Sequence, residues 1–147
     1  KSMRIILASS SPRWREILNL IGLKEFEVFP PRCPELKVKP PADVRLNAVL
    51  KARCVEKNLS RRGEYLIVAS DTAVFVNRQF LGKPKDREEA RRMLKTLSGR
   101  WHTVYTSLAV VYRNSRRKVL KTDLSAARVK FKRLSPEEIE WYLSSGE

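Results

Sequence analysis

The sequence is poor in the residue types that hold small proteins together by covalent or metal cross-links. It has two cysteines, one histidine and five glycines among 147 residues. The cysteines, Cys33 and Cys54, make no zinc-binding pattern with each other or with the histidine. We therefore expect two reduced thiols, with Cys54 on the buried face of a helix. Reduced thiols are typical of the cytosol, so we expect a cytoplasmic protein.

Long apolar runs are also missing. No segment approaches the roughly 18 residues of a membrane-spanning helix, and no signal-peptide pattern stands at the start of the chain. We expect no membrane partner. Met3 is expected to be the native start, with Lys1 and Ser2 left over from expression.

Acidic residues are scarce relative to basic ones. The chain has 31 Lys and Arg against 16 Asp and Glu, which gives a formal net charge of +15. The densest basic stretch, residues 113–133, holds nine basic residues and one acid, Asp123. This excess favours anionic partners, such as nucleic acid or a phosphorylated ligand. The stretch has few aromatic residues on which bases could stack, so two interpretations stay open. It forms either a nucleic-acid surface or a basic face that is merely solvated.

Apolar patterning predicts that strands and helices alternate along one domain, residues 1–147. The alternation indicates an α/β fold, a mixed twisted sheet with flanking helices. We expect strands at 3–8, 26–28, 65–69, 101–112 and 119–131, and segment 73–76 is either the hairpin partner of 65–69 or its continuation. We expect helices that begin at 11 or 12, 42, 87 and 136, of which the first ends at Gly22 and the last two start with capping boxes at 86–89 and 135–138. The buried faces of the first two helices are expected to hold Trp14, Ile17, Leu18 and Ile21, and then Val44, Leu46, Val49, Leu50, Cys54 and Val55.

The first candidate site is the serine-rich junction at residues 9–13, which joins a buried strand to a helix. A helix begins with unpaired N–H groups and a partial positive charge, which together attract an anion. The hydroxyl of Ser9 adds a donor, and Arg13 can hold two phosphate oxygens at once. An ordinary helix cap with a solvated arginine is the alternative.

The second candidate is Asp71, which follows the apolar strand 65–69 directly. Ligands of open α/β sheets gather at the carboxyl ends of strands, and an aspartate there can hold a metal or orient water. A turn-forming aspartate is the alternative. Lys51, Lys83 and Glu35 are further candidates, and each has a solvated charge as its alternative.

The motifs gain specificity when they are taken in order. L-A-S-S-S-P-R, S-D-T, L-G-K-P and E-E-A-x-x-M-L-x-x-L-S-G-x-W-H-T-V-Y-T follow one another along the chain. In this order they resemble the Maf family of house-cleaning nucleoside triphosphate pyrophosphatases, also called septum formation inhibitors. The resemblance implies an ITPase-like fold with two lobes around a nucleotide cleft. It also implies hydrolysis of a nucleoside triphosphate to the monophosphate and pyrophosphate, with Mg or Mn as cofactor.

The resemblance assigns roles to single residues. Asp71 would be catalytic, and Asp71 and Glu35 would hold the divalent metal. The substrate would be bound by Ser9, Arg13, Lys51, Thr72 and Lys83. Arg13 followed later by the D-T motif resembles the branch that acts on dTTP, UTP and modified pyrimidine nucleotides.

The resemblance also shows departures from the family. Trp14 stands where a second arginine is usual, and Arg32 and Pro34 stand where acids are often found. The family continues beyond the motif that ends at Glu147, so we expect its C-terminal segment to be absent here. A catalytically weak, basic domain that binds nucleic acid is the alternative function. The oligomeric state stays open between a monomer and a homodimer.

Overall fold

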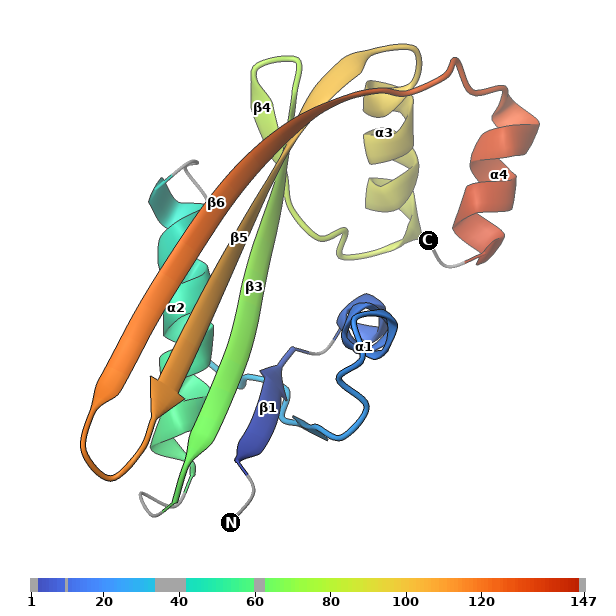
Figure 1. Ribbon diagram of the computed structural model, residues 1–147. Coiled ribbons are helices and arrows are strands. Elements are labelled where there is room, and N and C mark those ends of the chain that lie inside the picture. Colours follow the sequence, from blue (N-terminus) through green and yellow to red (C-terminus); the bar gives the residue numbers. More distant parts are fainter. Residues whose placement is uncertain (1–2, 10, 34–41, 60–62, 146–147) are drawn as a thin grey trace. The chain divides into compact units, whose positions relative to one another are not determined.

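The computed structural model describes residues 3–9, 11–33, 42–59 and 63–145 (Figure 1). Along the chain, strands and helices alternate as the hydrophobic pattern predicts. The elements are β1 (Arg4–Ala8), α1 (Pro12–Leu20), β2 (Glu27–Val28), α2 (Ala42–Lys57), β3 (Tyr65–Val76), β4 (Gln79–Leu81), α3 (Arg87–Leu97), β5 (Trp101–Arg113), β6 (Lys118–Lys130) and α4 (Pro136–Ser145).

Six strands form one mixed sheet, which confirms the predicted α/β class. The strand order is β2-β1-β3-β5-β6, and β4 pairs with β3. Strand β1 runs parallel to β2 and β3, whereas β4 runs antiparallel to β3. The chain divides into two compact units, residues 1–71 with 106–124 and residues 72–105 with 125–147. Strands β3, β5 and β6 contribute residues to both units.

The core of the first unit lies between α2 and one face of the sheet. Alternate residues of β1, β3 and β5 point to this face, because side chains of a strand alternate between its two sides. They meet small residues of α2, which let the helix approach closely. The buried cluster consists of Ile6, Ala8, Ala48, Ala52, Val55, Tyr65, Ile67, Ala69, Ala109 and Val111.

Helix α1 begins and ends where the sequence predicts. Pro12 is the first helical residue, a position at which its missing N–H costs nothing. Gly22 follows the last turn with a φ of 92°, a conformation that glycine adopts without strain. Leu18 is buried as predicted, but Ile21 is 67% exposed because it lies beyond the helix. The expectation that Ile21 is buried is therefore wrong.

Side-chain caps start both helices of the second unit at the predicted residues, with one bond of the predicted box at α3 and both bonds at α4. Asp86 accepts a hydrogen bond of 2.8 Å from the backbone N–H of Glu89 at the start of α3. At the start of α4, the Ser135 hydroxyl accepts from the N–H of Glu138, whose carboxylate accepts in return from the N–H of Ser135. These bonds satisfy N–H groups that a helix leaves unpaired at its start.

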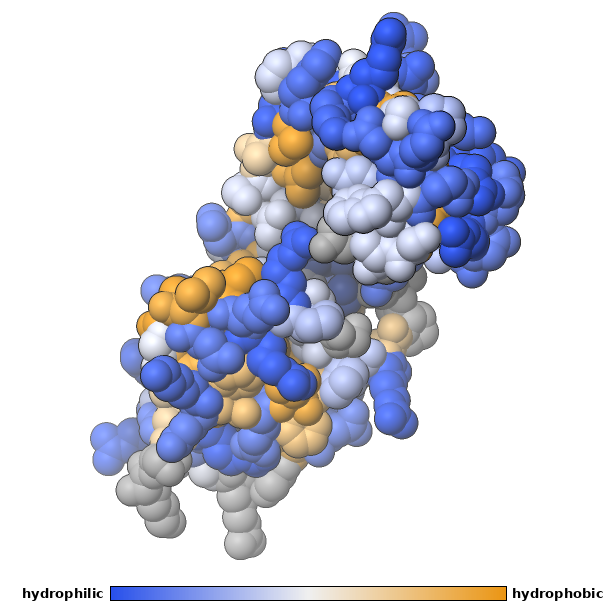
Figure 2. Space-filling model, turned by 90° about the vertical axis from the view of Figure 1, so that its right-hand side faces the viewer, coloured by the Kyte–Doolittle hydropathy of each residue, from blue (hydrophilic) through white to orange (hydrophobic). Residues whose placement is uncertain are grey.

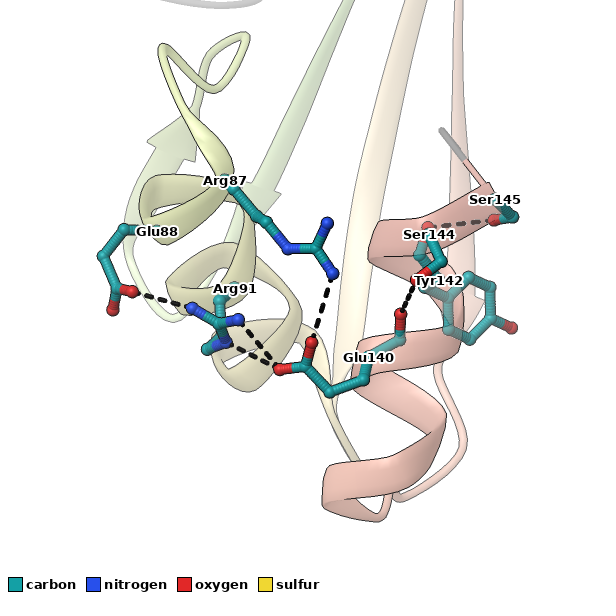
Figure 3. Close-up of polar contacts among 7 residues, drawn as sticks. All are labelled: Arg87, Glu88, Arg91, Glu140, Tyr142, Ser144 and Ser145. Atoms are coloured by element: carbon teal, nitrogen blue, oxygen red, sulfur yellow. Dashed lines mark hydrogen bonds and ion pairs between the residues drawn. The ribbon is translucent and has the colours of Figure 1, made fainter.

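The two helices of the second unit are joined by a charged network (Figure 3). Glu140 of α4 accepts hydrogen bonds from Arg87 at 3.3 Å and from Arg91 at 3.0 Å, both on α3. Arg91 also pairs with Glu88 within α3. Arg87, Glu88 and Glu140 are exposed and Arg91 is partly buried, so solvent screens much of this network and limits what it adds to stability.

Strand β3 continues without a break through residues 65–76. Segment 73–76 is therefore the continuation of the strand that begins at 65, and not its hairpin partner. It ends in a two-residue turn at Asn77 and Arg78, whose φ angles are 49° and 62°. Positive φ at both positions matches the twist of a tight hairpin, and asparagine tolerates it well. The short strand β4, which the sequence did not predict, follows this turn.

Two further expectations about α2 need correction. Leu46 is 44% exposed, whereas Asn47 is buried in its place. Cys33 and Cys54 are joined by a disulfide with a Cα–Cα distance of 6.3 Å, so the expectation of reduced thiols is wrong. The chain after β2 returns to α2 and brings Cys33 to the buried Cys54, a contact that a separation of 21 residues does not reveal. The thiols therefore no longer support a cytoplasmic location.

Polar and charged residues cover most of the face shown in Figure 2, and hydrophobic residues emerge in separate patches. Strand β6 is almost entirely exposed, which is consistent both with a solvated basic face and with a nucleic-acid surface. Within the described residues, no helix is both long and apolar enough to cross a membrane.

Candidate functional site

The candidate site of the first unit lies where β1 ends and its parallel pairing with β3 stops. Strands β1 and β3 pair in parallel as far as Ala8 and Ala69. Ser9 and Ser70 are the next residues of each strand, and Asp71 follows. Because the two strands run in the same direction, these polar residues come to the edge where the pairing of β1 with β3 stops, beyond the carboxyl end of β1, which is the kind of place where ligands of α/β proteins bind. The expectation that Asp71 follows the end of its strand is wrong, because β3 continues to Val76.

Helix α2 adds two polar side chains to this edge. Asn47 and Lys51 are four residues apart, so they lie on the same face of the helix, one above the other. The same face carries the small core residues Ala48 and Ala52, which hold the helix close to the sheet. Core packing therefore fixes the position of both polar groups relative to β3.

Asp71 is held by both of these groups. Its Oδ1 lies 3.0 Å from Nζ of Lys51, and its Oδ2 accepts a hydrogen bond of 3.2 Å from Nδ2 of Asn47. Lys51 also donates to the backbone carbonyl of Ser70 at 3.3 Å. Asp71 is only 8% exposed, so water solvates its carboxylate poorly. The ammonium group of Lys51 compensates the charge of the carboxylate instead.

Ser9 shapes the start of α1 at the same edge. Its Oγ accepts a hydrogen bond of 3.0 Å from the backbone N–H of Ser11. Ser11 occupies the cap position of α1, but its side chain makes no capping bond, and the first turn holds no acidic residue. Arg13 is exposed in that first turn. Serine hydroxyl, helix start and arginine together offer donors to an anion.

Asp71 fits a divalent cation as a single carboxylate ligand. The described residues contain no group of three or more His, Cys, Asp or Glu side chains that could hold a metal by themselves. Magnesium needs no such cage, since it is commonly held by one or two carboxylates, water and the phosphates of its substrate. Glu35, the second expected ligand, lies outside the described residues.

The other predicted contacts fall in the second unit. Thr72 follows Asp71 directly in β3 and is exposed. Lys83 is exposed in the loop between β4 and α3. The structure thus brings together Lys51 and Asp71 and places Ser9 and Arg13 in the same unit, whereas Thr72 and Lys83 belong to the other.

Sequence reasoning missed Asn47. It is 1% exposed and touches Asp71 directly. A signal for it existed, because a polar residue one helical turn before Lys51 shares the face of that lysine. The signal was masked by Leu46, which looked like the core residue of this turn.

The chain matches one family model and is similar to proteins of known activity. The family model for Maf-like protein matches residues 4–147. A dTTP/UTP pyrophosphatase of Aquifex aeolicus is 44% identical over 147 residues, which cover 99% of this chain and 73% of that protein. A dTTP/UTP pyrophosphatase of Thermotoga maritima is 42% identical over 142 residues, which cover 96% and 67%. Among solved structures, a HAM1 protein from Coxiella burnetii has a TM-score of 0.44 at 15% identity, covering 87% of this chain and 73% of that one.

Proposed function

Because this chain belongs to the Maf-like protein family, we propose that it hydrolyses nucleoside triphosphates to the monophosphate and pyrophosphate, with dTTP and UTP as substrates. The observation that carries the proposal is the buried carboxylate of Asp71 in β3, held by Lys51 and Asn47. A carboxylate whose two oxygens are both held loses little further conformational freedom when it acts on a substrate.

In this proposal Asp71 is the catalytic residue, and it orients the attacking water or accepts its proton. Lys51 stands beside it and can offset negative charge that develops on the phosphate in the transition state. Ser9 and Arg13 bind phosphate oxygens at the start of α1. Thr72 and Lys83 remain proposed substrate contacts on the strength of their motifs.

A divalent cation, magnesium or manganese, would be held by Asp71 and Glu35. When bound, it neutralises phosphate charge and polarises the phosphoryl oxygen. Asn47 would then position Asp71 through the bond from its amide to Oδ2. This makes Asn47 a positioning residue in the proposed site.

The test is pyrophosphate release from a panel of nucleoside triphosphates with magnesium or manganese. Asp71→Asn keeps the shape of the side chain and should lower kcat by at least about a hundredfold. Asp123→Asn, at an exposed acid of β6, is the matched control and should leave the rate unchanged. Equal rates in the two variants would refute the role of Asp71. Release from dTTP and UTP above the purine nucleotides would support the substrate assignment.

One observation favours nucleic-acid binding as a second candidate function. Strand β6 is exposed along nearly its whole length and carries basic side chains. Tight binding to single-stranded DNA that weakens steeply with salt would support it, and no binding at about 150 mM salt would remove it. We expect the enzyme to act in the cytoplasm. Its oligomeric state is a separate question, and analytical ultracentrifugation distinguishes a monomer from a homodimer.

A further inference from the structure

A basic cavity of about 500 Å³ lies in the first unit, apart from the site around Asp71. It is formed by the end of α2, residues 56–57, and by the β5–β6 turn with its flanks, residues 113–118. Figure 1 shows this turn at the same end of the unit as the start of β3. Six residues of extended strand, about 20 Å, separate that start at Tyr65 from Asp71.

The lining is dominated by positive charge. Its charged members are one acid, Glu56, and the five bases Lys57, Arg113, Arg116, Arg117 and Lys118. Three of the bases, Lys57, Arg116 and Arg117, are exposed and make no ion pair with any carboxylate among the described residues. A concave surface with such an excess concentrates anions.

Glu56 offsets only one of the five positive charges, that of Lys118, with which it is paired. Its Oε1 lies 2.7 Å from Nζ of Lys118, and its Oε2 accepts a hydrogen bond of 2.7 Å from the hydroxyl of Tyr65. Burial by itself raises the pKa of Glu56, but the hydrogen bonds from Lys118 and Tyr65 outweigh it, so the pKa is lowered. Glu56 therefore stays ionised and anchors Lys118 at the rim.

Hydrogen bonds within the turn that carries the arginines hold its backbone in place. Oδ1 of Asn114 accepts hydrogen bonds from the backbone N–H groups of Arg116 at 2.8 Å and Arg117 at 2.9 Å. Its backbone N–H donates to the carbonyl of Arg117 at 3.0 Å, and its Nδ2 donates to the hydroxyl of Tyr112. Because these backbone donors are used within the turn, an anion would meet guanidinium groups on a fixed support.

We propose that this cavity is a second anion-binding site that takes the phosphate groups of a polyphosphate ligand. Arginine suits this task because its planar fork binds two phosphate oxygens at once. The cavity has room for several phosphate groups, and the four bases beside the Glu56–Lys118 pair can neutralise them. The phosphates could belong to a small molecule or to a nucleic-acid backbone, since both present the same oxygens.

The test is a titration of the full chain with sodium tripolyphosphate, followed by amide NMR at about 150 mM salt. We expect chemical-shift changes at residues 114–118. The double variant Arg116→Gln/Arg117→Gln should weaken this binding by about tenfold or more. Arg92→Gln/Lys95→Gln removes the same charge from exposed positions of α3 and should bind as the unmodified chain does.

Asp71→Asn should leave the chemical-shift changes at residues 114–118 intact. A failure of the proposed anion site can therefore be distinguished from a failure of the proposed hydrolysis. A parallel titration with single-stranded DNA identifies the source of the phosphates. Binding of DNA that needs Arg116 and Arg117 assigns a nucleic-acid backbone, and binding of tripolyphosphate alone assigns a small ligand. If neither anion shifts residues 114–118, or if both double variants bind equally, the proposal is wrong.

Discussion

Nζ of Lys51 lies 3.0 Å from Oδ1 of Asp71, and their side chains are only 17% and 8% exposed. The pair joins the middle of α2 to Asp71, the last residue of β3 that belongs to the first unit. Water screens so buried a pair poorly, and each charge depends on the other. This mutual dependence makes the pair measurable apart from catalysis.

Replacing Lys51 alone should destabilise the fold strongly. Lys51→Met removes the ammonium group and leaves the buried carboxylate of Asp71 with the amide of Asn47. This loss should lower the free energy of unfolding by about 3 kcal/mol. Lys51→Met/Asp71→Asn removes both charges and should recover much of that loss. Urea denaturation of the single and double variants, read as a double-mutant cycle, measures the coupling.

The control for this cycle uses an exposed pair. Arg87 and Glu140 are 57% and 50% exposed. Their cycle, with Arg87→Met and Glu140→Gln, should give far smaller coupling because solvent screens them. Additive effects at Lys51 and Asp71 would show that the two charges do not depend on each other.

The sequence predicted this site in parts rather than as an assembly. Asp71 was found because it follows an apolar strand, and Lys51 because it sits on a largely apolar helix. Neither clue gives a distance between them. That distance depends on how closely α2 approaches the sheet, which alanines 48 and 52 decide through packing. Asn47 shares a helix face with Lys51, but the apolar Leu46 beside it looked like the core residue, and only the packing of α2 shows that Asn47 is the buried one.

The fold was predicted better than its details, also for physical reasons. Strand and helix periodicity and the capping boxes are local properties, so the main elements came out at their expected places. Ile21 and Leu46 were wrong because their exposure depends on where a helix ends and on which side of it meets the sheet. The disulfide was missed because it joins residues 21 apart through the tertiary fold.

The disulfide between Cys33 and Cys54 should contribute measurably to stability. It closes a loop across a sequence separation of 21 residues, for which the loss of unfolded-chain entropy predicts about 3 kcal/mol. Cys33→Ser should therefore lower the free energy of unfolding by about this amount under oxidising conditions. Guanidinium denaturation with and without dithiothreitol measures it.

The reductant itself provides the control. Dithiothreitol should destabilise the unmodified chain to the level of Cys33→Ser and leave that variant unaffected. Thiol labelling with mass spectrometry reports the bond directly, since an intact disulfide blocks both labels. Two labelled thiols in the untreated protein would contradict the pairing.

Ser107 should be a site where a smaller residue stabilises the fold. It is 0% exposed in β5, and its Oγ has no hydrogen-bond partner among the described residues. A buried hydroxyl that gives up water without gaining a partner costs free energy, so Ser107→Ala should raise the free energy of unfolding by about 1 kcal/mol. Ser125→Ala, at an exposed position of β6, should change it by less than about 0.5 kcal/mol. A loss of stability in Ser107→Ala would reveal a partner for this hydroxyl.

His102 should make the stability of the protein fall as the solution becomes mildly acidic. It is 8% exposed, its Nδ1 has no hydrogen-bond partner among the described residues, and burial lowers its pKa. The unfolded chain, with a histidine pKa of about 6.5, then binds the proton more readily than the folded one. The contribution of His102 is therefore fully present above that pH and is lost as the pH falls toward the folded pKa.

The measurement is the free energy of unfolding by urea at several values between about pH 5 and pH 7.5. His102→Phe cannot take up a proton, and its ring can pack beside that of Phe131, whose centroid lies 6.1 Å from the imidazole. Its stability should be flat across the upper part of this range, where the unmodified chain loses stability on acidification. Because His102 is the one histidine of the sequence, no other imidazole can produce the slope. An equal slope in both proteins would show that the imidazole takes up its proton as easily in the folded chain as in the unfolded one.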